Sequence, residues 1–103
     1  MSDITAAVTK STAAMDKFGK TAEELKQKVD AEVQAAKSFD KAYQAWLEKD
    51  TDKTRKAMAD AAEKLRNARS DRDKTQDKFN AAGREFFETQ MKLVQTIYES
   101  IRR

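Results

Sequence analysis

The chain has 103 residues, of which 38% are charged, and it contains no Pro, Cys or His. A chain of this length forms one domain at most, and high charge without Pro is typical of long helices. The lack of Cys and His excludes a disulfide framework and removes the usual zinc ligands and the usual general base. We therefore expect an all-α protein that is not an enzyme and that binds no cofactor and no metal.

The net charge of +3 is divided unevenly along the sequence. Residues 1–50 carry 8 basic and 9 acidic side chains, whereas residues 51–103 carry 13 basic and 9 acidic ones. This bias is weaker than the concentrated basic surface of a nucleic-acid-binding protein, so nucleic-acid and membrane partners are disfavoured. No apolar run could span a membrane and no signal peptide is evident. We expect a soluble protein, either cytoplasmic or exported without a cleaved signal.

A first helix is predicted over about residues 3–49. Apolar residues recur alternately three and four positions apart, which is the pattern of a helix that packs along a narrow seam. The predicted seam comprises Ile4, Val8, Ser11, Met15, Phe18, Ala22, Leu25, Val29, Glu32, Ala36, Phe39, Tyr43 and Trp46.

A turn is predicted at about residues 50–54. Extending the first seam beyond Trp46 gives an almost wholly polar stripe, and between Leu47 and Met58 only Ala57 is apolar. Asp50, Thr51 and Thr54 are all suitable N-cap residues for a following helix. The alternative is a single bent helix over nearly the whole length, because neither Pro nor Gly interrupts this stretch.

A second helix is predicted over about residues 55–102, again with an apolar seam. This seam comprises Met58, Ala61, Leu65, Ala68, Arg72, Thr75, Phe79, Ala82, Phe86, Thr89, Leu93, Ile97 and Ile101. The whole chain, residues 1–103, is then a single antiparallel two-helix coiled-coil hairpin, which would assemble into a four-helix bundle or a larger oligomer.

A turn centred near Asp52 brings the two charged residues of the seams to the same level. Glu32 then faces Arg72, while Phe18 faces Phe86 and Trp46 faces Met58. A charged pair within a helical interface can fix the register, whereas one such charge without its partner is destabilising. We therefore predict that Glu32 and Arg72 form a pair that sets the register.

Two further groups of apolar residues lie off the seams. Phe87, Met91, Val94 and Tyr98 follow a helical spacing on a face turned away from the second seam, which predicts an oligomer or partner interface. At the other end, Tyr43, Trp46 and Leu47 form a candidate anchor beside the turn. Trp46 is there either a core residue beneath the turn or an exposed contact for a partner.

Three families resemble this pattern. WXG-type small secreted proteins are of similar length and fold as helical hairpins with a Trp near the turn, where this chain has Trp46-Leu47-Glu48 without the Gly. Small helical chaperones and coiled-coil components of type III secretion are similar in size, charge and hairpin form. Residues 74–94 resemble a helix of BAR domains, which dimerise and bend membranes through basic faces.

The leading hypothesis is a helical-hairpin assembly protein that acts by self-association and protein–protein contact. It would be a structural subunit, a scaffold, or a secretion-type chaperone or adaptor, with a homo-oligomer or another protein as partner. The alternatives are a small secreted WXG-like hairpin, or a BAR-like membrane-surface binder that uses the basic second half.

Overall fold

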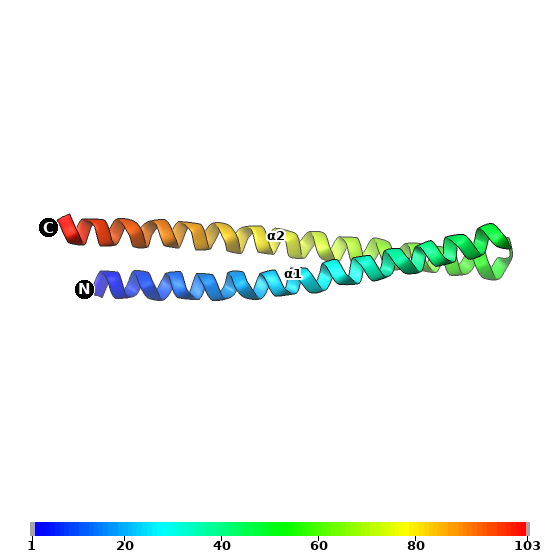
Figure 1. Cartoon of the computed structure of the whole chain (residues 1–103), viewed down its shortest axis with the longest axis horizontal. Helices are drawn as coiled ribbons and strands as arrows, with labels where there is room; N and C mark the ends of the chain where they lie inside the picture. The colour runs from blue at the N-terminus through cyan, green and yellow to red at the C-terminus, as the bar shows by residue number, and fades with distance from the viewer. Residues whose placement is uncertain (1, 103) are drawn as a thin grey trace. The chain divides into compact units, whose positions relative to one another are not determined.

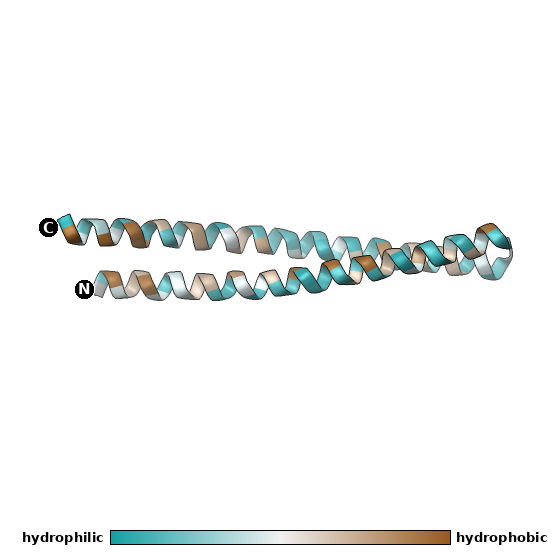
Figure 2. Ribbon diagram, in the orientation of Figure 1, coloured by the Kyte–Doolittle hydropathy of each residue, from teal (hydrophilic) through white to brown (hydrophobic). Residues whose placement is uncertain are grey.

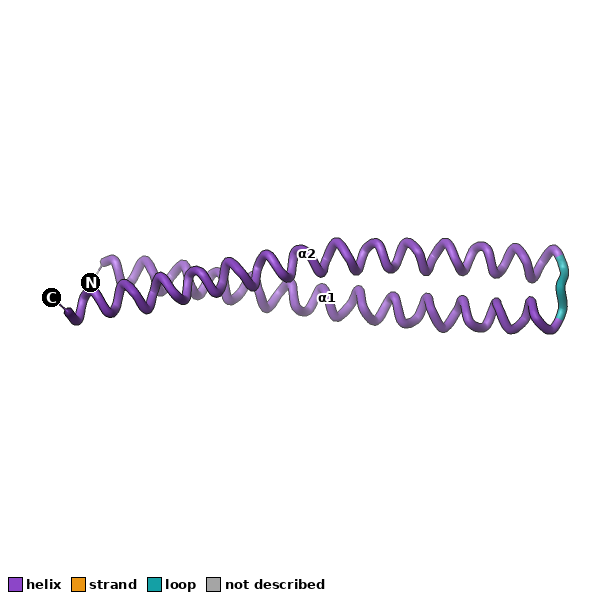
Figure 3. Tube along the Cα trace, turned by 90° about the horizontal axis from the view of Figure 1, so that it is seen from above, coloured by secondary structure: helices purple, strands orange, loops and turns teal. Residues whose placement is uncertain are grey.

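The fold consists of two long helices joined by a short connection, in a computed structural model that describes residues 2–102. Helix α1 spans Ser2–Glu48 and helix α2 spans Asp52–Arg102, and no strand occurs within the described residues. The chain reverses direction in a loop at residues 49–51 (Figures 1 and 3). This confirms the predicted all-α antiparallel hairpin and excludes a single bent helix.

The hairpin divides into two compact units. Unit 1 comprises Met1–Glu24 and Gln76–Arg103, so it pairs the beginning of α1 with the end of α2. Unit 2 comprises Leu25–Thr75 and contains the connection together with the helical segments on either side of it.

In unit 2, two threonines cap the start of α2. The Thr51 hydroxyl accepts a hydrogen bond from the Thr54 amide at 3.2 Å, and the Thr54 hydroxyl accepts one from the Thr51 amide at 2.9 Å. This reciprocal pair is a capping box in which Thr replaces the usual Glu or Gln. The Thr54 hydroxyl also lies 2.7 Å from the Lys49 carbonyl oxygen, to which it can donate. Thr51 is therefore the N-cap, and the connection is shorter and begins earlier than the predicted 50–54.

Asp50 links the last turn of α1 to the first turn of α2. Its carboxylate accepts two hydrogen bonds from the Arg55 guanidinium, at 2.6 and 2.9 Å, and one from the Trp46 indole nitrogen at 3.0 Å. The hydrogen bonds from Arg55 hold the pKa of the Asp50 carboxyl below its ordinary value, and Trp46 acts in the same direction. The turn is thus closed by polar bonds that need no glycine.

The residues buried most deeply between the helices are small. Only Ser11, Ala14, Thr75 and Ala82 are buried among the described residues. Ala14, Thr75 and Ala82 belong to columns of mainly small side chains at every seventh position, which let two helix backbones approach closely. On α1 the half-buried members of such a column include Ala7, Thr21, Ala35 and Ala42, and on α2 they are Ala61, Ala68, Thr89 and Thr96.

The predicted seam of α1 is wrong at four of its large residues. Val8, Met15, Val29 and Tyr43 are 40–49% exposed, whereas the alanines or other residues one position earlier are more buried. Because the small residues occupy the contact, each large neighbour is displaced to the flank of the helix pair. The predicted seam of α2 holds as far as Leu93. Beyond it Thr96 is half-buried, whereas Ile97 and Ile101 are exposed.

In unit 1, three phenylalanines pack together between the helices. The Phe18 ring from α1 stacks on Phe79 and Phe86 from α2, with ring centroids 4.9 and 5.9 Å away. A Cβ added at Gly83 would lie only 3.0 Å from the Phe18 ring, so this glycine makes room for the cluster. Ser11 in the same interface can accept a hydrogen bond from the Gln90 amide at 2.9 Å.

Candidate protein-interaction surface

A stripe of large apolar side chains lies exposed on α2 in unit 1. Phe87, Met91, Val94 and Tyr98, which the sequence predicted as an interface, are each 54–64% exposed. Strongly hydrophobic residues concentrate at this end of α2 (Figure 2). Their spacing of four, three and four residues keeps them on one helix face. The structure thus brings the four predicted residues together on one accessible surface.

Ile101 extends this stripe by one further three-residue step and is 79% exposed. The sequence-based prediction placed it in the seam between the two helices, which the structure corrects. The signal was present in the sequence, because Phe87, Met91, Val94, Tyr98 and Ile101 follow a heptad spacing of their own. We call these five residues the C-terminal stripe.

A shallow concavity follows the C-terminal stripe. It has a volume of about 740 Å³ and is lined by Phe87, Glu88, Met91, Lys92, Val94, Gln95 and Tyr98. Four of these lining residues are large and apolar, and the other three are polar or charged. Apolar and aromatic residues accompanied by polar ones are the usual composition of a protein–protein contact.

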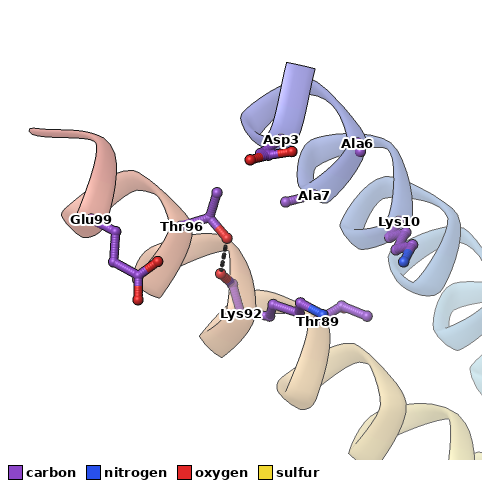
Figure 4. A pocket seen from close by; sticks show the side chains of 8 residues that line it. All are labelled: Asp3, Ala6, Ala7, Lys10, Thr89, Lys92, Thr96 and Glu99. Carbon is purple, nitrogen blue, oxygen red and sulfur yellow. Dashed lines mark hydrogen bonds between the residues drawn. The ribbon is translucent and has the colours of Figure 1, made fainter. Parts of the chain in front are cut away.

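Another flank of unit 1 is charged instead. Lys17 pairs with Glu85 at 3.1 Å and Lys78 with Glu24 at 3.8 Å, so the two helices are joined there by exposed ion pairs. A cavity of about 330 Å³ is lined by residues of both helices, namely Asp3, Ala6, Ala7, Lys10, Thr89, Lys92, Thr96 and Glu99 (Figure 4). Its charged side chains of both signs contrast with the apolar stripe.

The predicted register pair is in contact in unit 2. The Arg72 guanidinium donates to the Glu32 carboxylate, with Nε and Oε2 2.5 Å apart, and this bond raises the pKa of Arg72. Arg72 also lies 3.2 Å from the Asp73 carboxylate. The side chains of Arg72 and Glu32 are 33% and 24% exposed, so the pair is not buried as the seam predicted. Close packing of small residues leaves these long side chains at the edge of the contact.

The three residues of the candidate turn anchor differ in their surroundings. Trp46 is half-buried, its ring lies 5.9 Å from that of Tyr43, and its indole nitrogen donates to Asp50 within the turn. Tyr43 is 40% exposed and Leu47 is 57% exposed. Trp46 is thus engaged by its own turn, whereas its two neighbours remain accessible.

Sequence reasoning missed the exposed large residues on α1. Val8 and Met15 in unit 1 and Val29 in unit 2 were assigned to the seam, although each is accessible. The alanines at seven-residue intervals were the signal that could have revealed this, because a column of small residues competes with the large ones for the contact.

No cluster of three or more acidic side chains capable of holding a metal lies within residues 2–102. Neither of the two helices, over the described range, contains a segment long and apolar enough to cross a membrane. Comparison with known proteins found no matching family model, no matching curated protein and no matching solved structure.

Proposed function

We propose that this protein is a helical-hairpin assembly protein that binds other protein molecules through its C-terminal stripe. The first such partner is another copy of the same chain. The single observation that carries the proposal is the exposure of five large apolar side chains on one face of α2 in unit 1. Contiguous apolar surface of this kind usually marks an interaction site.

The contrast between the two surfaces of unit 1 supports the choice of site. On the charged flank, two ion pairs, Lys17–Glu85 and Lys78–Glu24, already join the two helices. The apolar side chains of the C-terminal stripe instead keep more than half of their surface accessible. Docking there would remove apolar surface from water at about 25 cal/mol per Å², less the costs of association.

Such a protein would serve as a structural subunit, a scaffold, or an adaptor or chaperone of the kind that secretion systems use. The first of these roles needs only self-association through the C-terminal stripe, and the others need a second protein on the same surface. A helix face with heptad spacing is suited to both, because it accepts another amphipathic helix.

The test is the mass of the protein in solution, measured by light scattering over a range of concentrations. Wild type is expected to exceed its monomer mass of 11.7 kDa as concentration rises, whereas Phe87→Glu/Val94→Glu stays monomeric. The matched control is Asn67→Glu/Ser70→Glu, which adds the same charge to two exposed positions of α2 outside the stripe and should associate like wild type.

Salt separates this proposal from binding through basic side chains. Raising ionic strength from about 0.1 M to about 1 M shortens the screening length from about 10 to about 3 Å, which weakens charge-driven binding. Apolar association should persist. If wild type and the double Glu variant are equally monomeric and equally helical at every concentration, the proposal is wrong.

A further inference from the structure

Four residues of the C-terminal stripe, Phe87, Met91, Val94 and Tyr98, have a palindromic arrangement. Reading from Phe87 to Tyr98, the spacing is four, three and four, with an aromatic residue at each end and aliphatic residues between them. We propose that a second copy docks on it antiparallel, across a two-fold axis, with Phe87 level with Tyr98 of the second copy. Met91 then lies level with Val94. This inference rests on the proposed function, because it names the partner and its orientation.

The palindrome matters because a two-fold contact uses the same surface twice. In such a contact residue i meets residue j, and j of the first copy meets i of the second. Reversing these four residues leaves both their spacing and their order of aromatic and aliphatic residues unchanged. The layers that they form in the antiparallel contact therefore each place an apolar side chain opposite another one.

Charges along the same face favour the antiparallel orientation over the parallel one. Towards the N-terminal end of α2, the same heptad spacing continues this helix face through Arg84, Asn80 and Asp77, all of them exposed. A parallel pair would set Arg84 against Arg84 and Asp77 against Asp77 at core positions, and like charges in contact are unfavourable.

The antiparallel pair avoids this repulsion. It places Arg84 level with Ile101 of the second copy, so neither cation meets its equivalent. At the margin, Glu88 approaches the uncharged Gln95 of the second copy rather than another carboxylate.

The area available is sufficient for a modest interface. Five large side chains that are each more than half exposed offer on the order of 500 Å² per copy, given about 150–250 Å² for an aromatic residue. Two copies together reach about 1,000 Å², which is the lower bound for a biological interface. Because the contact is two-fold, it closes at two copies and does not by itself propagate into a filament.

Disulfide cross-linking tests the orientation, and the chain suits it because it has no cysteine. Arg84→Cys and Ile101→Cys leave Phe87, Met91, Val94 and Tyr98 intact. An equimolar mixture should form mixed disulfides under mild oxidation, because the two positions share one layer. Each variant alone should not, since Arg84 and its equivalent are about 25 Å apart along the antiparallel pair at 1.5 Å per residue. A disulfide needs Cα atoms within about 7 Å.

Two controls complete the experiment. Ser70→Cys mixed with Ile101→Cys gives the level of linking by random collision, and adding Phe87→Glu to Arg84→Cys should reduce mixed linking to that level. Intact-mass spectrometry distinguishes mixed disulfides from self-linked ones.

The outcomes separate the orientation from the surface itself. Efficient linking of each variant to itself would show a parallel pair, and dimers without any specific linking would show another register. Either result overturns this inference but leaves the proposed function standing. A chain that light scattering finds monomeric at every concentration overturns both.

Discussion

Units 1 and 2 hold the same two helices together by different means. Unit 2 is closed by polar bonds, namely the Thr51–Thr54 capping box and the Asp50 carboxylate shared by Trp46 and Arg55. Unit 1 has a stacked phenylalanine cluster between its helices and a second set of large apolar residues on its surface. The difference indicates that polar bonds fix the turn in unit 2, while unit 1 exposes a stripe of five large apolar side chains, each more than half accessible, on one face of α2.

Among substitutions that test the contrast between the two units, Phe18→Ala is expected to have the largest effect on stability. Phe18 stacks on two phenylalanines of α2, so its removal should cost about 3 kcal/mol in the free energy of unfolding, the lower end for a Phe truncation because the ring is half-buried. Urea unfolding at a concentration where the chain is monomeric measures it. Phe87→Ala is the matched control and should change the monomer by less than about 1 kcal/mol. Equal losses would mean that unit 1 has no distinct core.

The next largest effect concerns the turn. Thr51→Ala removes the hydroxyl that caps the Thr54 amide and should lower the free energy of unfolding by about 1–2 kcal/mol. Thr51→Ser keeps an oxygen at the same place and should retain most of that stability. Thermal unfolding followed by circular dichroism compares the three chains. If Ser is as destabilising as Ala, the capping bond does not stabilise the turn.

A pair of glycines in unit 1 gives a smaller and sharper comparison. Gly19 has open space where a Cβ would stand, so Gly19→Ala should stabilise the helix by about 0.5–1 kcal/mol. At Gly83 the new Cβ would press on the Phe18 ring, which is held by Phe79 and Phe86, so Gly83→Ala should gain less or destabilise. Chemical unfolding of both variants measures the two changes in the free energy of unfolding. Equal stabilisation by the two substitutions would show that the Phe18 ring moves aside without cost.

The charged pair of unit 2 is expected to give the smallest effect. Glu32→Arg sets two cations together and should lower the unfolding midpoint, and adding Arg72→Glu should restore most of the loss. Because both side chains are partly exposed, solvent weakens the coupling relative to a buried pair. The four chains form a double-mutant cycle, and simple additivity of the two changes would show that the pair does not couple the helices.

The sequence was sufficient to predict the hairpin and its approximate register, because periodicity and the polar interval after Trp46 are local signals. Phe18 facing Phe86 and Glu32 facing Arg72 both follow from one choice of turn. Which residues fill the contact was harder to predict. The exposed Val8 and Met15 satisfy the same heptad period as Ala7 and Ala14 beside them. Only the close approach of the two helix backbones decides whether the alanine or the larger residue fills the contact.

The candidate surface was predictable in part, because its helical spacing is also a local signal. Phe87, Met91, Val94 and Tyr98 lie far enough around α2 from the seam that no small change of helix phase could bury them. Ile101 was misplaced because it fits the spacing of both the seam and the stripe. The detailed closure of the turn depended on which threonine became the N-cap, a choice that composition leaves open.

The central claim, that the C-terminal stripe is covered by association, is tested most directly by the peroxide oxidation of Met91. This side chain is 54% exposed in the single chain and lies in the middle of the stripe. Its oxidation rate, followed by peptide mass spectrometry, should fall as protein concentration rises in wild type and stay constant in Phe87→Glu/Val94→Glu. An oxidation rate of Met91 that is the same at every concentration, in a wild-type chain shown by light scattering to associate, would contradict the account.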